Sequence, residues 1–288
     1  MTDQTSPKGT FEVIVVDNDN IINTEVINIV GSAKNIINIR YIHEPILGLS
    51  QARNTGGKAA LAEYIGYMDD DAKAPENYIE MAILLIKNNN PEMIGGPYFP
   101  YYLKGKPKWF KDEYETGTSA EKSRKLIPGE FLNGTNMIFK KDILQSLNWF
   151  DTKYGMSGKA LAYGEETDLQ KRAWAKQKNL QVIYHKDLII YHLANPLKLR
   201  IYDRLRRKYK LGQSQAYLWI DKKQIPNVQK TAPLKLIKTI ALLLIKCLPG
   251  IVFRNQTKYK YWQNYVYEVL SNYFASIGQE WQYVKDRK

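Results

Sequence analysis

The stretch Tyr64-Ile65-Gly66-Tyr67-Met68-Asp69-Asp70-Asp71 is a short apolar run that ends in three adjacent carboxylates. Its length and composition predict a buried strand over Glu63–Met68 with the acidic triplet at its carboxyl end, where ligands bind in open α/β sheets. Adjacent aspartates repel one another unless a cation or hydrogen-bond donors compensate. Mg²⁺ or Mn²⁺ would do so while bridging the carboxylates to a diphosphate. The alternative is a solvated turn whose aspartates cap a helix beginning at Pro75.

The composition limits the class of protein. A chain of 288 residues can bury a sizeable core and form one large domain or a domain with an appendage. The single cysteine, Cys247, excludes a disulfide framework and is typical of a reducing compartment. The first residues lack the basic and apolar regions of a signal peptide. We therefore expect a cytosolic protein.

Charge is distributed unevenly along the chain. The formal net charge is +13, yet residues 1–197 hold 23 Lys and Arg against 24 Asp and Glu, whereas residues 198–288 hold 19 against 5. Such asymmetry indicates an anionic partner for the second part, either a membrane surface or nucleic acid. We expect a catalytic domain over residues 1–197 and a basic, aromatic-rich, membrane-associating region over residues 198–288.

The first part alternates strand and helix signals. Phe11–Asp17 is a β-branched apolar run that again ends in an acid, and Ile36–Ile42 has the composition of a further strand. Gly48-Leu49-Ser50 opens a helix, with Ser50 as the expected N-cap and Arg53 and Asn54 in the first turn. This alternation predicts an α/β architecture with a largely parallel sheet.

Further along, Pro75–Asn89 predicts an amphipathic helix, and Met93–Pro97 a short strand and turn. Residues 98–128 form a long segment without a clear pattern, and loops of this length are commonly functional. Its Trp and Tyr side chains could line an acceptor groove, or they could simply pack the segment against the protein.

Two later segments carry ionisable side chains at the ends of regular elements. Gly164–Arg172 begins a helix with acids in its first turn, where they serve either as ordinary dipole partners or as a general base. Leu188–His192 predicts a strand that ends in a histidine. A single histidine is more often structural than a metal ligand, so the residues alone leave its role open.

The basic region has the pattern of amphipathic helices. Lys198–Lys210 contains seven basic residues and one acid, and Leu234–Ile245 carries lysines on one side of a helix with Leu and Ile opposite. The longest uncharged stretch, Thr239–Ile245, is far too short to cross a bilayer. Together with the Tyr and Trp residues of 254–288, this pattern suits an anionic membrane interface. Base stacking with nucleic acid, or packing on the main domain, is the alternative.

Five segments, in this order, resemble the motifs of family 2 glycosyltransferases of the GT-A fold. The resemblance covers about residues 9–215 and is carried by Phe11–Asp19, Gly48–Asn54, Tyr64–Asp71, Gly134–Phe139 and Gly164–Arg172. It implies a Rossmann-type mixed sheet with helices on both faces, here followed by the basic helical extension. It also implies an enzyme that moves a sugar from a nucleotide diphosphate donor to an acceptor hydroxyl with the help of Mg²⁺ or Mn²⁺.

The resemblance implies roles for individual residues. The implied nucleotide-binding residues are Asp17, Arg53, Asp69 and Asp70, and the implied metal ligands are Asp71, Asp69 and His192. Members with the acidic helix motif usually invert the anomeric centre with a carboxylate as base. The family usually shows Glu-Asp where this chain has Glu165-Glu166, and we assign Glu166 as the base with Glu165 as the alternative.

One part of the family pattern is missing. The family normally begins with a strand and a helix ahead of the segment that starts here at Phe11, and that unit contributes to the nucleotide pocket. We interpret the sequence as a truncated reading frame or a variant with an altered donor site. A sheet without that strand should show an unpaired edge or a gap.

Three hypotheses follow. The first is an inverting, metal-dependent, hexosyltransferase-type enzyme at the inner face of the cell membrane, acting on a glycan or polyprenyl-linked acceptor in surface polysaccharide or lipopolysaccharide biosynthesis. The second is a non-catalytic GT-A-like binding or scaffold protein with an incomplete donor site. The third, a nucleic-acid binder, leaves Asp69–Asp71 and Glu165-Glu166 unexplained, so we expect no nucleic-acid partner. The sugar, nucleotide and linkage depend on pocket shape, which the sequence does not define.

Overall fold

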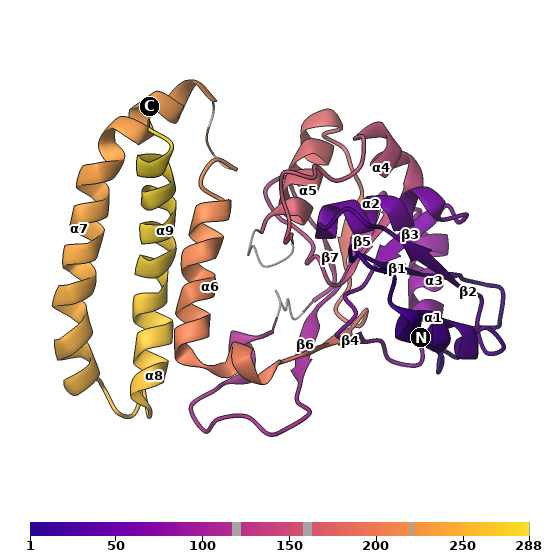
Figure 1. Ribbon diagram of the computed structural model, residues 1–288, viewed down its shortest axis with the longest axis horizontal. Helices are drawn as coiled ribbons and strands as arrows, with labels where there is room; N and C mark the ends of the chain where they lie inside the picture. The colour runs from indigo at the N-terminus through magenta and orange to yellow at the C-terminus, as the bar shows by residue number, and fades with distance from the viewer. Residues whose placement is uncertain (117–121, 158–162, 219, 221, 288) are drawn as a thin grey trace. The chain divides into compact units, whose positions relative to one another are not determined.

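The computed structural model describes residues 1–116, 122–157, 163–218, 220 and 222–287, and the chain divides into two compact units (Figure 1). The first unit holds the strands and consists of Met1–Tyr101, Glu115–Gly158 and Glu165–Leu193. The second holds the longest helices and consists of Tyr102–Tyr114, Lys159–Gly164 and Ala194–Lys288. The predicted boundary at residue 197 lies just inside the second unit, and the functional division that it marks stays a prediction.

The main sheet of the first unit is mixed. Its order is β3-β8-β5-β9-β7, with β3 at Tyr64–Tyr67, β8 at Met137–Lys140, β5 at Met93–Gly95, β9 at Val182–Tyr184 and β7 at Arg124–Lys125. Strand β8 runs antiparallel to both β3 and β5, whereas β5 and β9 are parallel. The largely parallel sheet expected from the alternation of strands and helices is therefore wrong, because β8 enters late in the chain between two earlier strands.

Both faces of this sheet are covered. Alternate residues of β8 and β5 point to opposite sides, as the two-residue period of a strand requires. Met93, Met137 and Phe139 pack with Leu144 of helix α4 (Lys141–Ser146) and Leu169 of helix α5 (Glu165–Lys176). Ile94 and Ile138 pack on the other face with Ala82 and Leu85 of helix α3 (Tyr78–Asn89). The predicted α/β arrangement with helices on both faces is confirmed.

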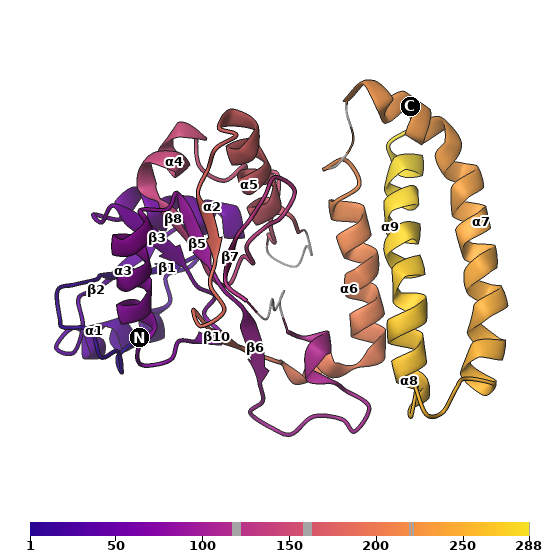
Figure 2. The same ribbon diagram turned by 180° about the vertical axis from the view of Figure 1, so that it is seen from behind.

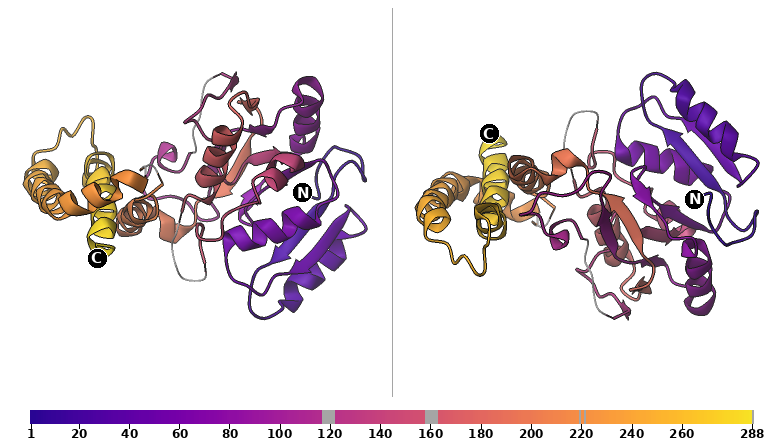
Figure 3. Two further views of the ribbon diagram at one scale, coloured as in Figure 1. Left: turned by 90° about the horizontal axis from the view of Figure 1, so that it is seen from above. Right: turned by 90° about the horizontal axis from the view of Figure 1, so that it is seen from below.

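Strands β1 (Val13–Asp17) and β2 (Ile39–His43) form a separate parallel pair. Figure 3 shows this pair with helices α1 (Thr24–Ala33) and α2 (Leu49–Ala59) beside it. In the part of the chain that the structure describes, no backbone ladder joins β1 or β2 to β3. The sheet is thus interrupted beside β1, as the family pattern leads us to expect.

A small third sheet brings distant segments together. Its order is β4-β10-β6, with β4 at Ala72–Lys73, β10 at Ile190–Leu193 and β6 at Tyr98–Tyr101 (Figure 1 labels β4, and Figure 2 labels β10 and β6). Residues His192 and Ala72 face each other in the antiparallel ladder between β10 and β4. The fully buried Asn136 holds the chain before β10, because its amide donates to the carbonyl of Leu188 at 2.6 Å and to that of Pro97 at 3.1 Å.

Two helix starts differ from the sequence-based expectation. Helix α3 begins at Tyr78 rather than Pro75, so the acidic triplet does not cap it. Helix α2 begins at Leu49 with Gly48 as its N-cap, and the Ser50 hydroxyl instead donates to the carbonyl of Tyr154 at 2.6 Å. The N-cap assignment for Ser50 is wrong because a partner 104 residues away in sequence captures its hydroxyl.

The second unit is helical. Helices α6 (Ile201–Ser214) and α7 (Ile225–Val252) lie on either side of α9 (Ser271–Lys285), and the short α8 (Trp262–Tyr265) precedes α9 (Figure 1). Two glycines permit the close contact of α6 with α9. A Cβ atom at Gly212 would lie 1.9 Å from the carbonyl oxygen of Ala275, and one at Gly278 would lie 2.0 Å from that of Tyr209. Larger residues at either position would force these helices apart.

The loop over Tyr102–Tyr114 packs within this helical unit. Trp109 and Phe110 are buried, and their rings contact at 5.4 Å between centroids. The amide of Asn264 donates to the Trp109 carbonyl at 2.6 Å, and the guanidinium of Arg204 lies 5.2 Å from the Phe110 ring. Packing therefore accounts for the buried position of these two side chains, and an acceptor groove lined by the aromatic residues of 98–128 stays a prediction.

Candidate active site

Three potential metal ligands converge where β3 ends and β10 passes β4. The backbone N–H of Leu193 donates to the Asp71 carbonyl at 2.9 Å, which fixes the acidic loop beside β10. The Nε2 atom of His192 lies 3.0 Å from Asp71 Oδ1 and 3.7 Å from Asp69 Oδ2. One ligand atom from each of these residues lies within 4.8 Å of the other two. The structure therefore brings together the three residues that the sequence analysis named as metal ligands.

The chemistry of this cluster fits a divalent cation. Two carboxylate oxygens and one imidazole nitrogen suit Mg²⁺ or Mn²⁺, which prefer oxygen-rich sites. All three side chains are half-buried, so the repulsion between the carboxylates of Asp69 and Asp71 is screened less than it would be in water. The third aspartate, Asp70, is exposed and lies outside the cluster. Metal binding itself stays a prediction.

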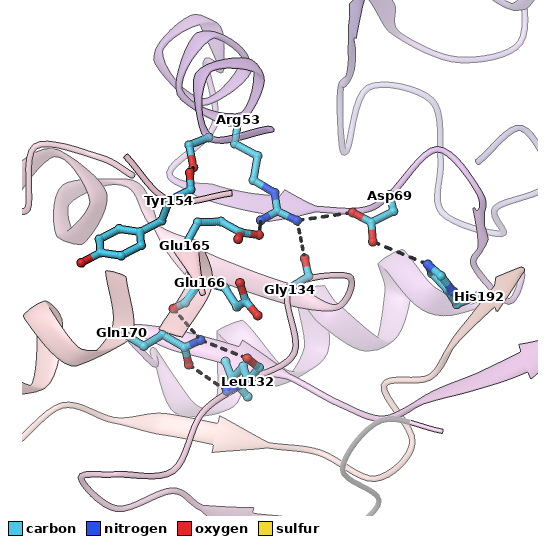
Figure 4. A network of polar contacts seen from close by, with 10 residues as sticks. Arg53, Asp69, Leu132, Gly134, Tyr154, Glu165, Glu166, Gln170 and His192 are labelled. Carbon is cyan, nitrogen blue, oxygen red and sulfur yellow. Dashed lines mark hydrogen bonds and ion pairs between the residues drawn. The ribbon is translucent and has the colours of Figure 1, made fainter. Parts of the chain in front are cut away.

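Arg53 links this cluster to the start of α5 (Figure 4). Its Nη1 donates to Glu165 Oε1 at 2.8 Å, and its Nη2 donates to Asp69 Oδ1 at 3.3 Å and to the Gly134 carbonyl at 3.2 Å. Only 8% of the Arg53 surface is exposed. A planar guanidinium with five N–H donors can hold several acceptors in a fixed arrangement, which a lysine ammonium cannot. In this geometry Arg53 orients two carboxylates, and its predicted contact with the nucleotide remains to be tested.

The two glutamates at the start of α5 differ in environment. Glu165 is buried and ion-paired with Arg53, so its carboxylate is already engaged. Burial raises the pKa of Glu166 to about 8, and the neighbouring charge of Glu165 adds to this shift. A carboxylate whose pKa lies near neutrality is suited to general-base work. The geometry therefore favours Glu166 over Glu165 as the base.

Gln170 contacts the backbone of Glu166 and links it to Leu132 (Figure 4). Its side chain is fully buried, accepts from Leu132 N–H at 2.8 Å and donates to the Leu132 carbonyl at 3.0 Å. The same amide donates to the backbone carbonyl of Glu166 at 3.1 Å. Gln170 is not among the residues predicted from the sequence. Its spacing of four residues from Glu166 was the available signal, because residues at i and i+4 share a helix face.

Asp17 lies at the end of β1, apart from this network. Its Oδ2 accepts from the Tyr41 hydroxyl at 2.7 Å and from Asn23 N–H at 2.9 Å. These bonds hold the pKa of Asp17 below its usual range and fix the turn into α1. Among the described residues, no hydrogen bond or ion pair joins Asp17 or Asp70 to Arg53. Their nucleotide-binding roles stay predictions.

Comparison with known proteins identifies the family of this chain. The family described as Glycosyl transferase family 2 matches residues 1–147, which is half of the chain, so the protein belongs to this family. A relative, the glucosyl-dolichyl phosphate glucuronosyltransferase of Haloferax volcanii, is 26% identical over 155 residues. That match covers 50% of this chain and 47% of the relative, so the chain spans about half of the relative's length.

Solved structures share the fold. The mannosyltransferase PcManGT of Pyrobaculum calidifontis, in complex with GDP-Man and Mn²⁺, superposes with a TM-score of 0.62 at 18% identity, over 97% of this chain and 80% of that one. Staphylococcus aureus TarS 1–349, in complex with UDP-GlcNAc, gives a TM-score of 0.53 at 14% identity, over 98% and 83%. The predicted GT-A fold is therefore confirmed.

Proposed function

We propose that this chain transfers a sugar from a nucleoside diphosphate donor to an acceptor hydroxyl, with inversion at the anomeric carbon, in the synthesis of a surface polysaccharide or lipopolysaccharide. The observation that carries the proposal is the connection of Asp69, Asp71 and His192, through Arg53, to the Glu165–Glu166 pair. A metal-ligand set and a carboxylate base are the two parts that such a displacement needs. The complexes of PcManGT with GDP-Man and of TarS with UDP-GlcNAc support a nucleotide-sugar donor.

Each residue has a defined task in this reaction. Glu166 removes the proton of the acceptor hydroxyl. At the same time the hydroxyl oxygen attacks the anomeric carbon, and the bond from that carbon to the diphosphate breaks. Glu165 and Arg53 hold α5 and the acidic loop in one arrangement, so the base is oriented before substrate arrives. Asp69, Asp71 and His192 would hold Mg²⁺ or Mn²⁺, which when bound neutralises charge on the departing diphosphate. We assign Asp17, Asp70 and Arg53 to the nucleotide.

Nucleotide binding is expected to depend on the metal. Titration calorimetry with UDP and with GDP should give binding in Mn²⁺ that weakens at least tenfold when the metal is removed with EDTA. Asp71→Ala should weaken it equally, because one of three ligands is lost. Asp142→Ala is the matched control, since it removes an exposed acid from the first turn of α4. Metal-independent binding that Asp71→Ala leaves unchanged would contradict the metal assignment.

A second candidate function follows from the interrupted sheet. Because no ladder joins β1–β2 to β3 in the described chain, the donor site could lack part of its nucleotide pocket. The chain would then be a non-catalytic GT-A-like binding protein. Absence of binding to UDP, GDP and dTDP, in a protein that is folded by circular dichroism, would favour this candidate over the enzyme.

We also propose that the protein binds peripherally to the inner face of the cell membrane, where it meets a polyprenyl-linked acceptor. Helix α7 exposes an apolar stripe: Leu234, Ile237, Leu244 and Leu248 fall within roughly 80° of one another at 100° per residue, and each is 65% exposed or more. Lys230 lies one turn before Leu234 on the same side of the helix, and Lys238 lies roughly 40° from the edge of this stripe, whereas Lys235 points toward the other side. In the described chain, no helix combines the length and hydropathy needed to cross a bilayer. Lysines next to an exposed apolar stripe suit an anionic lipid surface.

Vesicle flotation tests the membrane proposal. The protein should float with vesicles containing anionic lipid, and added salt should reduce the bound fraction because charge contributes to binding. Leu244→Asp combined with Leu248→Asp should reduce the bound fraction at least tenfold. Leu61→Asp is the matched control, because Leu61 is 81% exposed but belongs to the first unit. Equal flotation of the α7 variant and the wild type would reject this surface as the membrane contact.

A further inference from the structure

The second unit contains a cavity of about 450 Å³ at the beginning of α6, and this cavity is open to solvent. It lies between the loop Tyr102–Tyr114, the turn Pro196–Leu199 and helix α8. Its lining includes Lys104, Trp109, Leu199, Arg200, Ile201 and Gln263. None of these residues belongs to the metal-ligand cluster or to the Glu165–Glu166 pair, so the cavity is a separate feature of the protein.

The inner wall of the cavity is rigid. Trp109 and Leu199 are both less than a tenth exposed and belong to one buried cluster. The Trp109 carbonyl accepts from the Asn264 amide at 2.6 Å, which ties the loop to α8. Asn195 Oδ1 accepts from Leu197 N–H at 3.0 Å and caps the turn that carries Leu199. A wall held in this way is formed before a ligand arrives, which lowers the entropic cost of binding.

The rim of the cavity is cationic. Lys104 and Arg200 both line it, and among the described residues neither forms an ion pair with a carboxylate. In the same loop, Lys106 is already neutralised by Asp112. Arg200 is the N-cap of α6 and provides no side-chain cap, so the positive end of the helix dipole lies at the rim as well. These charges favour an anion.

The remaining lining is mostly hydrocarbon. Trp109, Leu199 and Ile201 provide apolar surface, and Gln263 is the one side-chain amide among the described residues that line the cavity. A nucleobase would need several hydrogen-bonding partners, which this lining does not offer. An anion attached to a hydrocarbon chain fits both the cationic rim and the apolar wall.

The cavity and the C-terminal end of α7 lie at the same end of the helical unit. Figure 1 shows that α6 begins, α7 ends and α8 lies at the same end of the helical unit. Leu248, Val252 and Phe253 at this end of α7 are 74%, 64% and 84% exposed. A hydrocarbon chain that leaves the cavity would therefore find further apolar surface on the same unit.

We propose that this cavity binds the phosphate and the first isoprenoid units of a polyprenyl phosphate-linked acceptor, an inference that rests on the proposed function. Lys104 and Arg200 bind the phosphate, and Trp109, Leu199 and Ile201 contact the hydrocarbon. The cavity thus selects lipid-linked acceptors over free glycans by contacts with the phosphate and the hydrocarbon, which are not the reacting part of the acceptor. Binding energy from such a remote part of a substrate can position the reacting group.

Calorimetry with farnesyl phosphate, below the concentration at which it forms micelles, tests this proposal on the full chain. We expect saturable binding with a Kd in the micromolar range, and at least tenfold weaker binding of farnesol and of inorganic phosphate. Lys104→Glu combined with Arg200→Glu should weaken binding at least tenfold. Both side chains are exposed, so these changes leave the core intact. Arg206→Glu, an exposed change on α6 outside the cavity, should bind like the wild type.

The outcomes separate this inference from the proposed function. Asp71→Ala should leave farnesyl phosphate binding unchanged, and the double variant should leave Mn²⁺-dependent nucleotide binding unchanged. Equal binding by the double variant and by Arg206→Glu would overturn the cavity proposal even if the nucleotide site works. Equal affinity for inorganic and farnesyl phosphate would show a general anion site and overturn the lipid assignment.

Discussion

Replacing Glu166 with glutamine is expected to lower kcat by about 10³-fold, because the carboxylate that accepts the hydroxyl proton is lost. Glutamine keeps the shape of the side chain, and the Gln170 amide still bonds to the backbone carbonyl of residue 166. Nucleotide affinity in Mn²⁺ should therefore stay within about twofold of the wild-type value. Steady-state kinetics measures the first quantity and titration calorimetry the second.

The pH profile distinguishes a base from a residue that only supports the fold. Burial and the neighbouring Glu165 raise the pKa of Glu166 from 4.5 to about 8, and the base acts only when it is deprotonated. The rate of the wild type should therefore increase with pH, reach half its maximum near pH 8 and level off above that pH. The residual activity of Glu166→Gln should lose this dependence. If the profile persists in Glu166→Gln and disappears in Glu165→Gln, the roles of the two glutamates are reversed.

The contribution of Glu166 to the free energy of unfolding should decrease as pH rises, whereas the reaction rate increases. A carboxyl whose pKa is raised in the folded state stabilises the fold fully below its unfolded value of about 4.5, and this contribution is lost as pH rises through about 8. Above pH 8 the wild type keeps a buried charge that glutamine does not carry. Glu166→Gln should thus be more stable than the wild type at pH 9 by roughly 2–4 kcal/mol, with little difference at pH 5. Urea unfolding at both pH values measures this difference.

The features that could be predicted from the sequence depend on neighbouring residues. The strand before Asp69 follows from a short apolar run, and a short strand was also expected at Met93, where β5 begins. The convergence of Asp69, Asp71 and His192 was also predictable in outline. The acidic triplet and His192 were each expected at the end of a strand. That they belong to one metal site was implied by the family resemblance, because periodicity alone does not show which strand ends meet.

The features that could not be predicted depend on partners far away in sequence. Ser50 has the residue type and position of an N-cap, but the carbonyl of Tyr154 binds its hydroxyl. The choice between Glu165 and Glu166 depends on Arg53, which is 112 residues from Glu165 along the chain. Tertiary hydrogen bonds of this kind leave no local periodicity, so side chains that look equivalent in the sequence acquire different tasks.

Arg53→Met is expected to lower the free energy of unfolding by about 3–5 kcal/mol and activity by more than 100-fold. Methionine fills a similar volume but leaves the buried Glu165 carboxylate without its ion-pair partner, and removing one partner of a buried pair costs about this much. Activity falls because Asp69 and the start of α5 lose the group that orients both. Urea unfolding at pH 7 and single-turnover kinetics measure the two effects.

Arg124→Met is the matched control. Its pair with Glu130 is 2.5 Å long but lies at the surface, with side chains 42% and 32% exposed, so its loss should lower the free energy of unfolding far less than the loss of Arg53. The double variant Arg53→Met with Glu165→Gln should recover much of the stability lost by Arg53→Met, because no buried charge then remains unpaired at residue 165. It should not recover activity, since Asp69 still lacks the guanidinium. Recovery of both stability and activity would show that Arg53 acts only by neutralising Glu165. Recovery of neither quantity would show that Arg53 acts mainly through its bonds to Asp69 and to the Gly134 carbonyl.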